Sequence, residues 1–489
     1  MFPLSSLQNK LFMGNASESF KPSIGLFDAT LIVAGSMIGS GIFIVSADIT
    51  RNVGSAGWLI LIWLLTGLMT LIAALSYAEL SGMYPKAGGQ YVYLKQAYNP
   101  LIGFLYGWSF FTVIQTATIA AVGVAFSKFL AYLVPELGNN YLLTTIAGLK
   151  IYSGQLVAIF IITLLTYINT RGVKEAKSIQ RIFTTAKLAA LFGLIVFGFL
   201  LVKDSYWAEN WKTGFSAVQN LGAKDASGSL QPTQWMGIAG SALVGAIAAA
   251  MVGSIFSSDA WNNVTFIASE MKNPARNLGL SLFLGTLIVT LIYVSANLMY
   301  LNVLPLQDIA FAKDDRVAVA AANKIFPAFG TIFIAVCIMI STFGCNNGLI
   351  LAGARVYYTM ANDGLFFKQV GTLNKHGVPE KALWIQCVAC CLWCLSGKYG
   401  DLLDMISFVV VLFYMLTIIG IFILRKKEPN LPRPYKAFGY PILPMLYLLM
   451  GGTFCFLLVH FKPQFTWPGL IITLLGVPIY FLAIRNKAK

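Results

Sequence analysis

Charged residues are scarce in this sequence. Of its 489 residues, 11% are Asp, Glu, Lys or Arg, whereas 57% are hydrophobic and the mean hydropathy is +0.74. A water-soluble domain carries about 25% charged residues, so this chain lacks the polar surface that water requires. It also lacks a hydrophilic stretch long enough for a separate soluble domain. These absences exclude an ordinary soluble protein and indicate that lipid is the solvent.

Histidine is rare, and so are acids within apolar stretches. His376 and His460 fall in a predicted loop and near a predicted helix end, and Asp259 and Asp404 are the acids within apolar stretches. An intramembrane hydrolase, a metal site or a carboxylate–histidine proton relay needs such groups clustered at mid-membrane. We therefore expect neither an enzyme nor a bound metal ion or cofactor. A receptor that binds without transporting is an alternative that the sequence leaves open.

Cysteine is absent from the predicted outer loops. The seven cysteines all fall in apolar stretches, which excludes a disulfide framework. Cys387, Cys390, Cys391 and Cys394 share a face at helical spacing. Packing as small hydrophobic side chains explains them better than a metal site, because no histidine or carboxylate accompanies them. Residues 1–22 show no short apolar core followed by a cleavage site, so we expect no removable signal peptide.

Apolar stretches of membrane-spanning length are what the sequence has in abundance. About 20 helical residues cross a hydrocarbon core, whereas tilted barrel strands need only roughly 10, so the stretches predict helices. The prediction is an all-α polytopic membrane protein with twelve transmembrane helices. The approximate spans are 26–48, 57–80, 101–134, 155–170, 180–202, 236–270, 277–303, 328–360, 381–396, 401–424, 437–461 and 466–485.

The net charge of +15 follows the predicted topology and does not indicate a nucleic-acid partner. Of the 34 Lys and Arg residues, 22 lie on the side of the two termini and 11 on the other side, with Lys187 in mid-helix. Basic residues are enriched in cytoplasmic loops, so both termini are expected in the cytoplasm. The basic excess also attracts anionic membrane lipid.

The spans suggest a division of the chain into five parts. We expect a cytoplasmic N-terminal segment, a first group of five helices, an extracellular loop, a second group of five helices, and a final pair of helices with the cytoplasmic C-terminus. Their boundaries are 1–24, 25–202, 203–235, 236–424 and 425–489.

Two of the predicted spans contain interruptions. Glycine and serine crowd the first span at 34–43, and Ser257 to Asn263 brings polar residues and an acid into the sixth. Glycine costs a helix about 1 kcal/mol relative to alanine, and a charge at the bilayer centre costs at least about 2.5 kcal/mol. Close packing through small residues, or a helix end at the interface, is the alternative explanation. Because both interruptions fall first in each group of five, broken helices that line a transport site are favoured.

Broken helices expose the backbone groups that a zwitterionic amino acid requires. Amides after a break suit a carboxylate, and carbonyls before it suit an ammonium group. The glycines at 39 and 41 let a ligand approach the backbone closely. The candidate substrate-binding residues are Met37, Ile38, Gly39, Ser40, Gly41 and Ile42 on the first helix and Phe256, Ser258 and Asp259 on the sixth.

Lys187 lies about seven residues into the fifth predicted helix. Extension of the side chain to the inner membrane surface is one explanation. The alternative is an ammonium group that points into the bundle and bonds to carbonyls and hydroxyls. Ser341 on the eighth predicted helix is a suitable partner for it.

Five motifs follow one another along nearly the whole chain. They are Gly39-Ser40-Gly41-Ile42-Phe43; Tyr77-Ala78-Glu79-Leu80 with Pro85, Gly88-Gly89 and Tyr91; Phe256 to Asn262 with Glu270 and Asn273-Pro274; Phe183-Thr184 with Lys187; and Phe343-Gly344 with Asn347-Gly348. In this order they resemble the amino acid–polyamine–organocation superfamily, most closely its L-type amino acid transporters and their bacterial relatives. The resemblance implies the leucine-transporter-type fold, with two inverted repeats of five helices, broken helices 1 and 6, and peripheral helices 11 and 12.

The resemblance also implies roles for individual residues. The lysine of the fifth helix, here Lys187, stands in the place of a sodium ion, and Phe256 matches an aromatic gate over the substrate. Asn262 matches a polar pocket residue, and Ile114 and Thr118 match the pocket for the substrate side chain.

This sequence departs from the family pattern at several positions. Ser257-Ser258 replaces a common Ala-Tyr, and Cys345 replaces a serine that is frequent in animal members. Ala260 replaces a common glycine and is expected to narrow the pocket.

The resemblance implies sodium-independent exchange of L-amino acids by alternating access, and we expect neutral L-amino acids as substrates and the plasma membrane as the location. A carrier of cationic amino acids or polyamines, motivated by Asp259, and proton-coupled uptake are the alternatives. The carboxylate of Asp259 is a weaker indication because it follows the interruption and is expected to face the first helix or solvent. No cysteine lies between the third and fourth helices, so no disulfide-linked heavy chain is expected, and a bacterial source is the natural interpretation.

Overall fold

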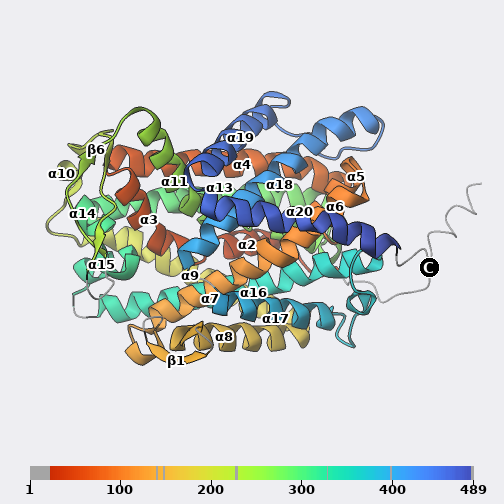
Figure 1. Ribbon diagram of the computed structural model, residues 1–489, viewed down its shortest axis with the longest axis horizontal. Coiled ribbons are helices and arrows are strands. Elements are labelled where there is room, and N and C mark those ends of the chain that lie inside the picture. The colour runs from red at the N-terminus through yellow and green to blue at the C-terminus, as the bar shows by residue number, and fades with distance from the viewer. Residues whose placement is uncertain are drawn as a thin grey trace, which may run out of the picture.

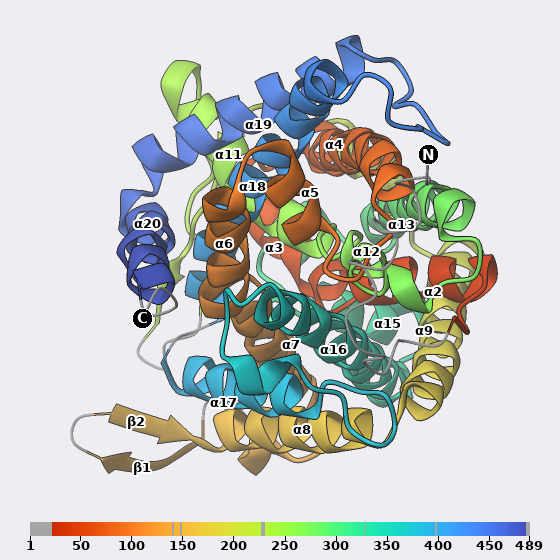
Figure 2. The same ribbon diagram turned by 90° about the vertical axis from the view of Figure 1, so that its right-hand side faces the viewer.

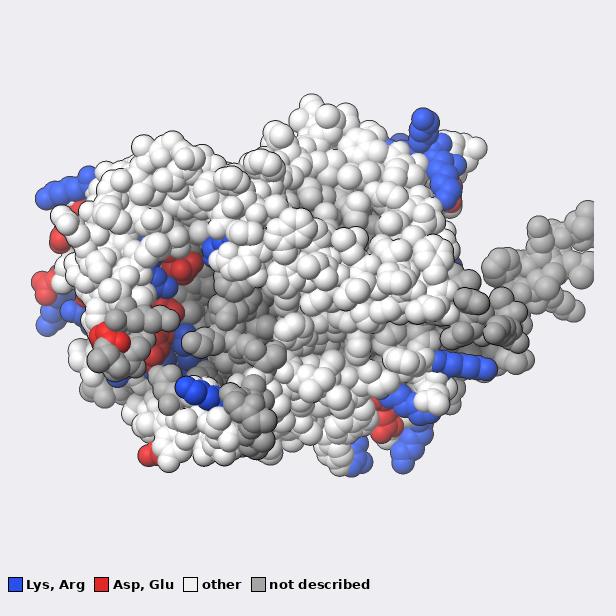
Figure 3. Space-filling view, viewed as in Figure 1, with Lys and Arg blue, Asp and Glu red and all other residues white. Residues whose placement is uncertain are grey.

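Helices run side by side along one axis of the molecule (Figure 1). The computed structural model describes residues 22–138, 141–146, 149–225, 230–327, 329–396 and 399–485. One end of the bundle carries α10 (Trp207–Trp211), α14 (Leu306–Ala310) and α15 (Val317–Ile325) and is called the α10 end. The opposite end carries α5 (Gln90–Ala97) and is called the α5 end. Charged side chains gather at these two ends, and the band between them is almost entirely uncharged on the face shown (Figure 3).

In the described part of the chain, nine helices are long and apolar enough to cross a membrane, and a bent pair of shorter helices makes ten. The bent pair is α2 (Leu26–Met37) and α3 (Gly41–Asn52). The nine comprise α4 (Ala56–Met83), α6 (Pro100–Ser109) continuing through a π-helical turn (Phe110–Ile114) into α7 (Gln115–Leu130), α8 (Ser153–Thr170), α9 (Val173–Leu200), α11 (Gly240–Ser257), α13 (Pro274–Val303), α16 (Gly330–Asn362), α18 (Tyr399–Lys427) and α19 (Ile442–Phe461).

Two further helices occupy the remaining predicted spans. They are α17 (Glu380–Ser396) and α20 (Pro463–Arg485), and the apolar part of α20, Thr466–Leu482, is shorter than the others. The structure therefore confirms a helical polytopic membrane fold, while the count of twelve spans and the inverted repeats stay predictions.

Large apolar side chains cover the outside of this bundle. Phe160, Leu392 and Ile442 are 64%, 65% and 73% exposed. Lipid contacts such side chains favourably, and lipid also offers no partner to backbone N–H and C=O groups, which is why the spanning segments are helices.

The two interrupted helices lie in the interior of the bundle. In the end-on view, α3 and the short α12 (Asn263–Phe266) lie near the centre, surrounded by longer helices, whereas α19 and α20 lie at the edge (Figure 2). This arrangement places both interruptions away from lipid.

The sixth predicted helix ends earlier than expected. α11 stops at Ser257, and only the single turn of α12 and a 3₁₀ turn (Ala268–Glu270) follow before α13 begins. The prediction of an interruption at this position is therefore correct, but the part beyond it is not a second long half-helix.

The connections at the α10 end contain structure that the sequence did not predict. β1 (Leu142–Ile146) pairs with β2 (Leu149–Tyr152) in an antiparallel hairpin between α7 and α8. The predicted loop 203–235 carries α10 and short paired strands. These are β3 (Val218–Gln219) with β6 (Met236–Gly237) and β4 (Ala223–Lys224) with β5 (Leu230–Gln231).

Backbone hydrogen bonds join the chain entering α2 to the chain leaving α12. The N–H groups of Ser23 and Ile24 donate to the Glu270 carbonyl at 2.7 and 3.0 Å, and Lys272 N–H donates to the Ile24 carbonyl at 2.9 Å. The carboxylate of Glu270 pairs with Arg355 of α16 at 3.0 Å, and this pair is fully buried. The two interrupted helices are thus tied together and to α16.

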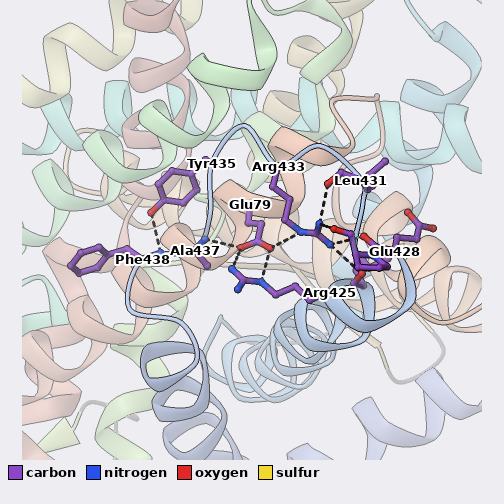
Figure 4. Close-up of polar contacts among 10 residues, drawn as sticks. Glu79, Arg425, Glu428, Leu431, Arg433, Tyr435, Ala437 and Phe438 are labelled. Atoms are coloured by element: carbon purple, nitrogen blue, oxygen red, sulfur yellow. Dashed lines mark hydrogen bonds and ion pairs between the residues drawn. The ribbon is translucent and has the colours of Figure 1, made fainter.

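A second buried carboxylate holds elements together at the α5 end. Glu79 of α4 is 1% exposed and accepts two hydrogen bonds from Arg425 of α18, at 2.9 and 2.6 Å (Figure 4). Arg433 lies 3.4 Å from the same carboxylate, and the Ala437 N–H donates to it at 2.7 Å. Glu79 therefore joins α4, α18 and the connection between α18 and α19.

The neighbouring Tyr84 belongs to the same region. Its hydroxyl donates to Glu428 at 2.8 Å, and burial together with this carboxylate raises the pKa of Tyr84. The hydroxyl consequently remains a donor at neutral pH.

Candidate functional site

The interruption of the first helix spans three residues. α2 ends at Met37, Ile38 is extended (φ −75°, ψ 93°), and α3 begins at Gly41, with a bend of 42° between the two helices. The extended residue turns carbonyl groups away from the backbone hydrogen bonds of the helix. Neighbouring helices must therefore supply hydrogen-bond donors to these carbonyl groups.

Lys187 of α9 supplies two of these donors. Its ammonium nitrogen lies 2.5 Å from the Gly35 carbonyl oxygen and 2.5 Å from the Ile38 carbonyl oxygen. The residue is 1% exposed, so the side chain points into the bundle and does not extend to the membrane surface. Its role in transport stays a prediction.

α16 supplies the other donors. The Ser341 hydroxyl lies 3.2 Å from the Gly39 carbonyl oxygen and 3.4 Å from that of Ile38. The Cys345 thiol lies 3.1 Å from the Ser36 carbonyl oxygen. Lys187 and Ser341 thus both contact the Ile38 carbonyl oxygen, at the interruption of the first helix.

Tyr293 of α13 contacts both interruptions, and sequence reasoning missed it. Its hydroxyl lies 3.1 Å from the Met37 carbonyl oxygen and 2.9 Å from the Ser257 carbonyl oxygen. A hydroxyl has one proton, so it donates to one of these oxygens at a time. The Tyr293 ring packs edge-on against Trp63 of α4, with ring centroids 5.1 Å apart.

Gly41 serves the packing of the two interrupted helices. A Cβ atom at this position would lie 1.9 Å from the Ser257 hydroxyl oxygen. The sequence-based reason for this glycine was close approach of a ligand, and in the structure Ser257 of α11 occupies that space.

The sixth helix unwinds over Ser258 to Asn262. Ala260 has φ +64°, in the left-handed region that disfavours a residue with a Cβ atom. This geometry gives a physical reason for the glycine that the resemblance implies at this position. Alanine at this position holds about 1–2 kcal/mol of strain, which is typical of functional segments.

A small cavity adjoins the unwound segment. It lies between that segment, α6 and α7, α5, and α18. Four predicted site residues line it: Ile114, Thr118, Asp259 and Asn262. The remaining lining residues are Gln90, Tyr106, Phe110, Gln115, Ala260, Asn263, Val410, Phe413 and Tyr414. This space is called the main cavity below.

Other predicted residues lie elsewhere. Residues 37–42 and Phe256 do not line the main cavity. Phe256 is 8% exposed on the last turn of α11, and its carbonyl accepts the Asp259 N–H at 3.2 Å. Ser258 lines a second small cavity between α4, α18 and α19, and Asp259 borders both cavities.

Polar side chains in the main cavity are linked through Gln90, which the sequence reasoning did not single out. Asn262 donates to the Gln90 amide oxygen at 2.9 Å, and Gln90 donates to the Thr417 hydroxyl at 3.0 Å. This chain connects the unwound segment to α18. The Thr118 hydroxyl donates back to the Ile114 carbonyl at 2.6 Å, directly after the π-helical turn.

The carboxylate of Asp259 accepts a hydrogen bond from Tyr414 of α18. Asp259 is 8% exposed, and none of the described Lys, Arg or His side chains forms an ion pair with it. Tyr414 also escaped the sequence reasoning, because a tyrosine in an apolar helix has no local signal that separates it from a packing residue. Within the described residues, no three His, Cys, Asp or Glu side chains gather as a metal site would require.

Comparisons with known proteins match almost the whole chain. A family model described as amino acid permease matches residues 24–483. The large neutral amino acids transporter small subunit 2 of Oryctolagus cuniculus is 31% identical over 478 residues, covering 97% of this chain and 83% of the relative. The Asc-type amino acid transporter 1 of Mus musculus is 30% identical over 482 residues, covering 97% and 84%. The b(0,+)-type amino acid transporter 1 of Mus musculus is 26% identical over 488 residues, covering 96% and 90%.

Proposed function

This chain belongs to the amino acid permease family, and we propose a specific transport reaction for it. It is a multi-pass membrane transporter of amino acids. The proposed reaction is sodium-independent exchange of neutral L-amino acids across the plasma membrane by alternating access.

The contact of Lys187 with the first interruption supports the proposal that transport requires no sodium ion. In transporters with broken helices, unwound carbonyls coordinate the coupling ion. Here the Lys187 ammonium nitrogen already bonds to the Gly35 and Ile38 carbonyl oxygens, and lies 2.5 Å from each. A positive charge that the protein itself provides removes the need for a sodium ion at this point.

The interruptions supply the proposed receptor for the amino acid backbone. The amides of Ser40, Gly41 and Ile42, at the start of α3, are proposed to bind the substrate carboxylate. Carbonyls near Met37, Phe256 and Ser258 are proposed to bind its ammonium group. The side chain then enters the main cavity with Ile114, Thr118 and Asn262, and Phe256 acts as the gate.

The chain is further proposed to work without a disulfide-linked heavy chain, with both termini in the cytoplasm of a bacterium. One relative is named as a small subunit. All seven cysteines of this chain are free and lie in helices, which supports an independent carrier.

Counterflow in proteoliposomes tests the exchange. Purified protein is reconstituted, the vesicles are loaded with unlabelled L-amino acids, and entry of labelled alanine, serine or leucine is followed with sodium or choline as the external cation. We expect entry that depends on internal substrate and is equal in both salts. Rapid entry into empty vesicles would contradict exchange, and a requirement for sodium would contradict the role given to Lys187.

A second candidate function is favoured by Asp259. The sequence interpretation placed this acid toward the first helix or solvent, and the structure instead places it in the lining of the main cavity. A carrier of cationic amino acids or polyamines would use such a carboxylate. Counterflow of arginine and putrescine, and of alanine under an imposed pH gradient, separates this candidate and proton-coupled uptake from neutral exchange.

A further inference from the structure

Acidic side chains at the α5 end have partners inside the protein. Glu79 is paired with Arg425 and Arg433, and Glu270 with Arg355. The other described acids of this end have one partner each in the following contacts: Asp28 with Arg181, Asp363 with Lys95, Glu380 with Asn374, and Glu428 with Tyr84. These described acids therefore offer little counter-charge to the exposed lysines of the same end.

Lys426 and Lys436 are two of these exposed lysines, and the contact at Glu79 holds them in one region. Lys426 directly follows Arg425, and Lys436 directly precedes Ala437. The Arg425 guanidinium and the Ala437 N–H both donate to the Glu79 carboxylate (Figure 4). Within the described residues, neither lysine is paired with an acid. The structure thus places two uncompensated positive charges on the same part of the α5 end.

Exposed apolar side chains follow Lys436 directly. Phe438, Ile442 and Met445 are 68%, 73% and 58% exposed, and the Phe438 ring points away from Glu79 (Figure 4). Ile442 and Met445 are three residues apart at the start of α19, so they share one face of that helix. An apolar surface of this kind is unfavourable in water and favourable in lipid. Lys436 therefore lies where the acyl chains end and the lipid headgroups begin.

We infer that the end of α18 and its connection to α19, residues 426–442, bind an anionic phospholipid in the leaflet at the α5 end. Lys426 and Lys436 bind the headgroup phosphate, and Phe438 and Ile442 contact the acyl chains. The Tyr435 hydroxyl accepts a bond from the Phe438 N–H at 3.3 Å and can donate its own proton to the same phosphate. A phospholipid fits better than a soluble anion, because the cationic and apolar groups are adjacent. This binding goes beyond the proposed exchange and does not depend on it.

Titration of the purified full chain with phosphatidylglycerol in neutral detergent tests the inference. Bound lipid is quantified by native mass spectrometry, and phosphatidylcholine, which has no net charge, is titrated in parallel. Each lysine near an anionic lipid surface contributes roughly fivefold in affinity, so two lysines predict a preference of roughly twenty- to thirtyfold for phosphatidylglycerol. In the double variant Lys426→Gln, Lys436→Gln this preference should disappear.

A matched control removes the same charge elsewhere at the α5 end. Lys375 and Lys381 are also exposed, in the connection between α16 and α17 and at the start of α17. The double variant Lys375→Gln, Lys381→Gln should retain most of the preference. Phe438→Ser keeps both lysines of the site and should weaken the binding of both phospholipids several-fold, because an acyl-chain contact is lost.

Equal binding of the two phospholipids to the wild type would overturn the inference, and so would an equal loss of preference in the two double variants. Displacement of phosphatidylglycerol by the same concentration of inorganic phosphate would overturn the assignment to a lipid, since phosphate makes no apolar contact with Phe438. The measurement follows lipid binding alone, so a failure of the proposed exchange would leave its outcome unchanged.

Discussion

Lys187 is the residue that the sequence singles out most directly. A lysine within an apolar helix is rare enough to stand out, and its two carbonyl partners lie at the interruption that the glycines predicted. Asp259 stood out for the same reason, but the direction of its side chain could not be predicted. The backbone of an unwound segment follows no regular period, so the sequence does not indicate which way each side chain points. Gln90, Tyr293 and Tyr414 could not be found at all, since polar side chains of this size are common in membrane helices.

Lys187→Ala should lower the turnover of exchange by about tenfold and change substrate affinity less, because two hydrogen bonds from a charged group are lost. Initial rates over a range of substrate concentrations separate the two quantities. Lys203→Ala, an exposed lysine beyond the end of α9, is the control and should behave as the wild type. Full turnover in Lys187→Ala would show that the ammonium group contributes only to packing.

Ala260→Gly should relieve backbone strain and widen the main cavity. Because φ is +64°, we expect thermal stability to stay equal or rise by about 1 kcal/mol, and larger side chains to compete better for transport. The matched control is Ala248→Gly inside α11, which should lose about 0.5–1 kcal/mol. Loss of stability in both variants would mean that position 260 is not strained.

At the scale of elements, the interruption of the first helix was predictable and the shape of the sixth was not. Glycine and serine mark the first directly. The apolar run after Asn263 suggested a helix to residue 270, but the chain there folds into one turn and a 3₁₀ turn that pack among other elements. The β1–β2 hairpin was missed because its strands are short and lie between two long apolar spans.

Tyr293→Phe tests whether the two interruptions act together. The ring and its contact with Trp63 remain, while the Met37 and Ser257 carbonyls lose their shared donor. We expect the exchange rate to fall several-fold, with thermal stability reduced by about 1 kcal/mol. Tyr300→Phe is the control, because that hydroxyl contacts a single carbonyl, of Ile42, at 3.2 Å. Equal effects of the two variants would argue against a special role for Tyr293.

At the scale of the whole molecule, composition alone identified the membrane and the helical class. The final number of spans was harder to predict, since α17 is 17 residues long and the apolar part of α20 is confined to Thr466–Leu482. Long-range ionic contacts such as the one at Glu79 depend on residues some 350 positions apart in the chain, and a single sequence contains no signal for that pairing.

Glu79→Gln should destabilise the fold by about 3–5 kcal/mol, because it leaves Arg425 and Arg433 without their buried counter-charge. Thermal unfolding in detergent measures the loss. Glu428→Gln in the same region keeps an oxygen that accepts the Tyr84 hydroxyl and removes only the charge, so it should cost at most about 0.5–1.5 kcal/mol. A similar change in both variants would show that Glu79 is not the centre of the contact.

The backbone pairing of Ser23 and Ile24 with Glu270 and Lys272 has a consequence for the transport cycle. If the two segments moved independently, the transporter would reach states in which one segment is open and the other is closed. Substrate would leak through the protein in such states. These segments share three backbone hydrogen bonds, so moving one without the other would break those bonds, and joint movement is favoured. We therefore expect the α5 end to open as one step.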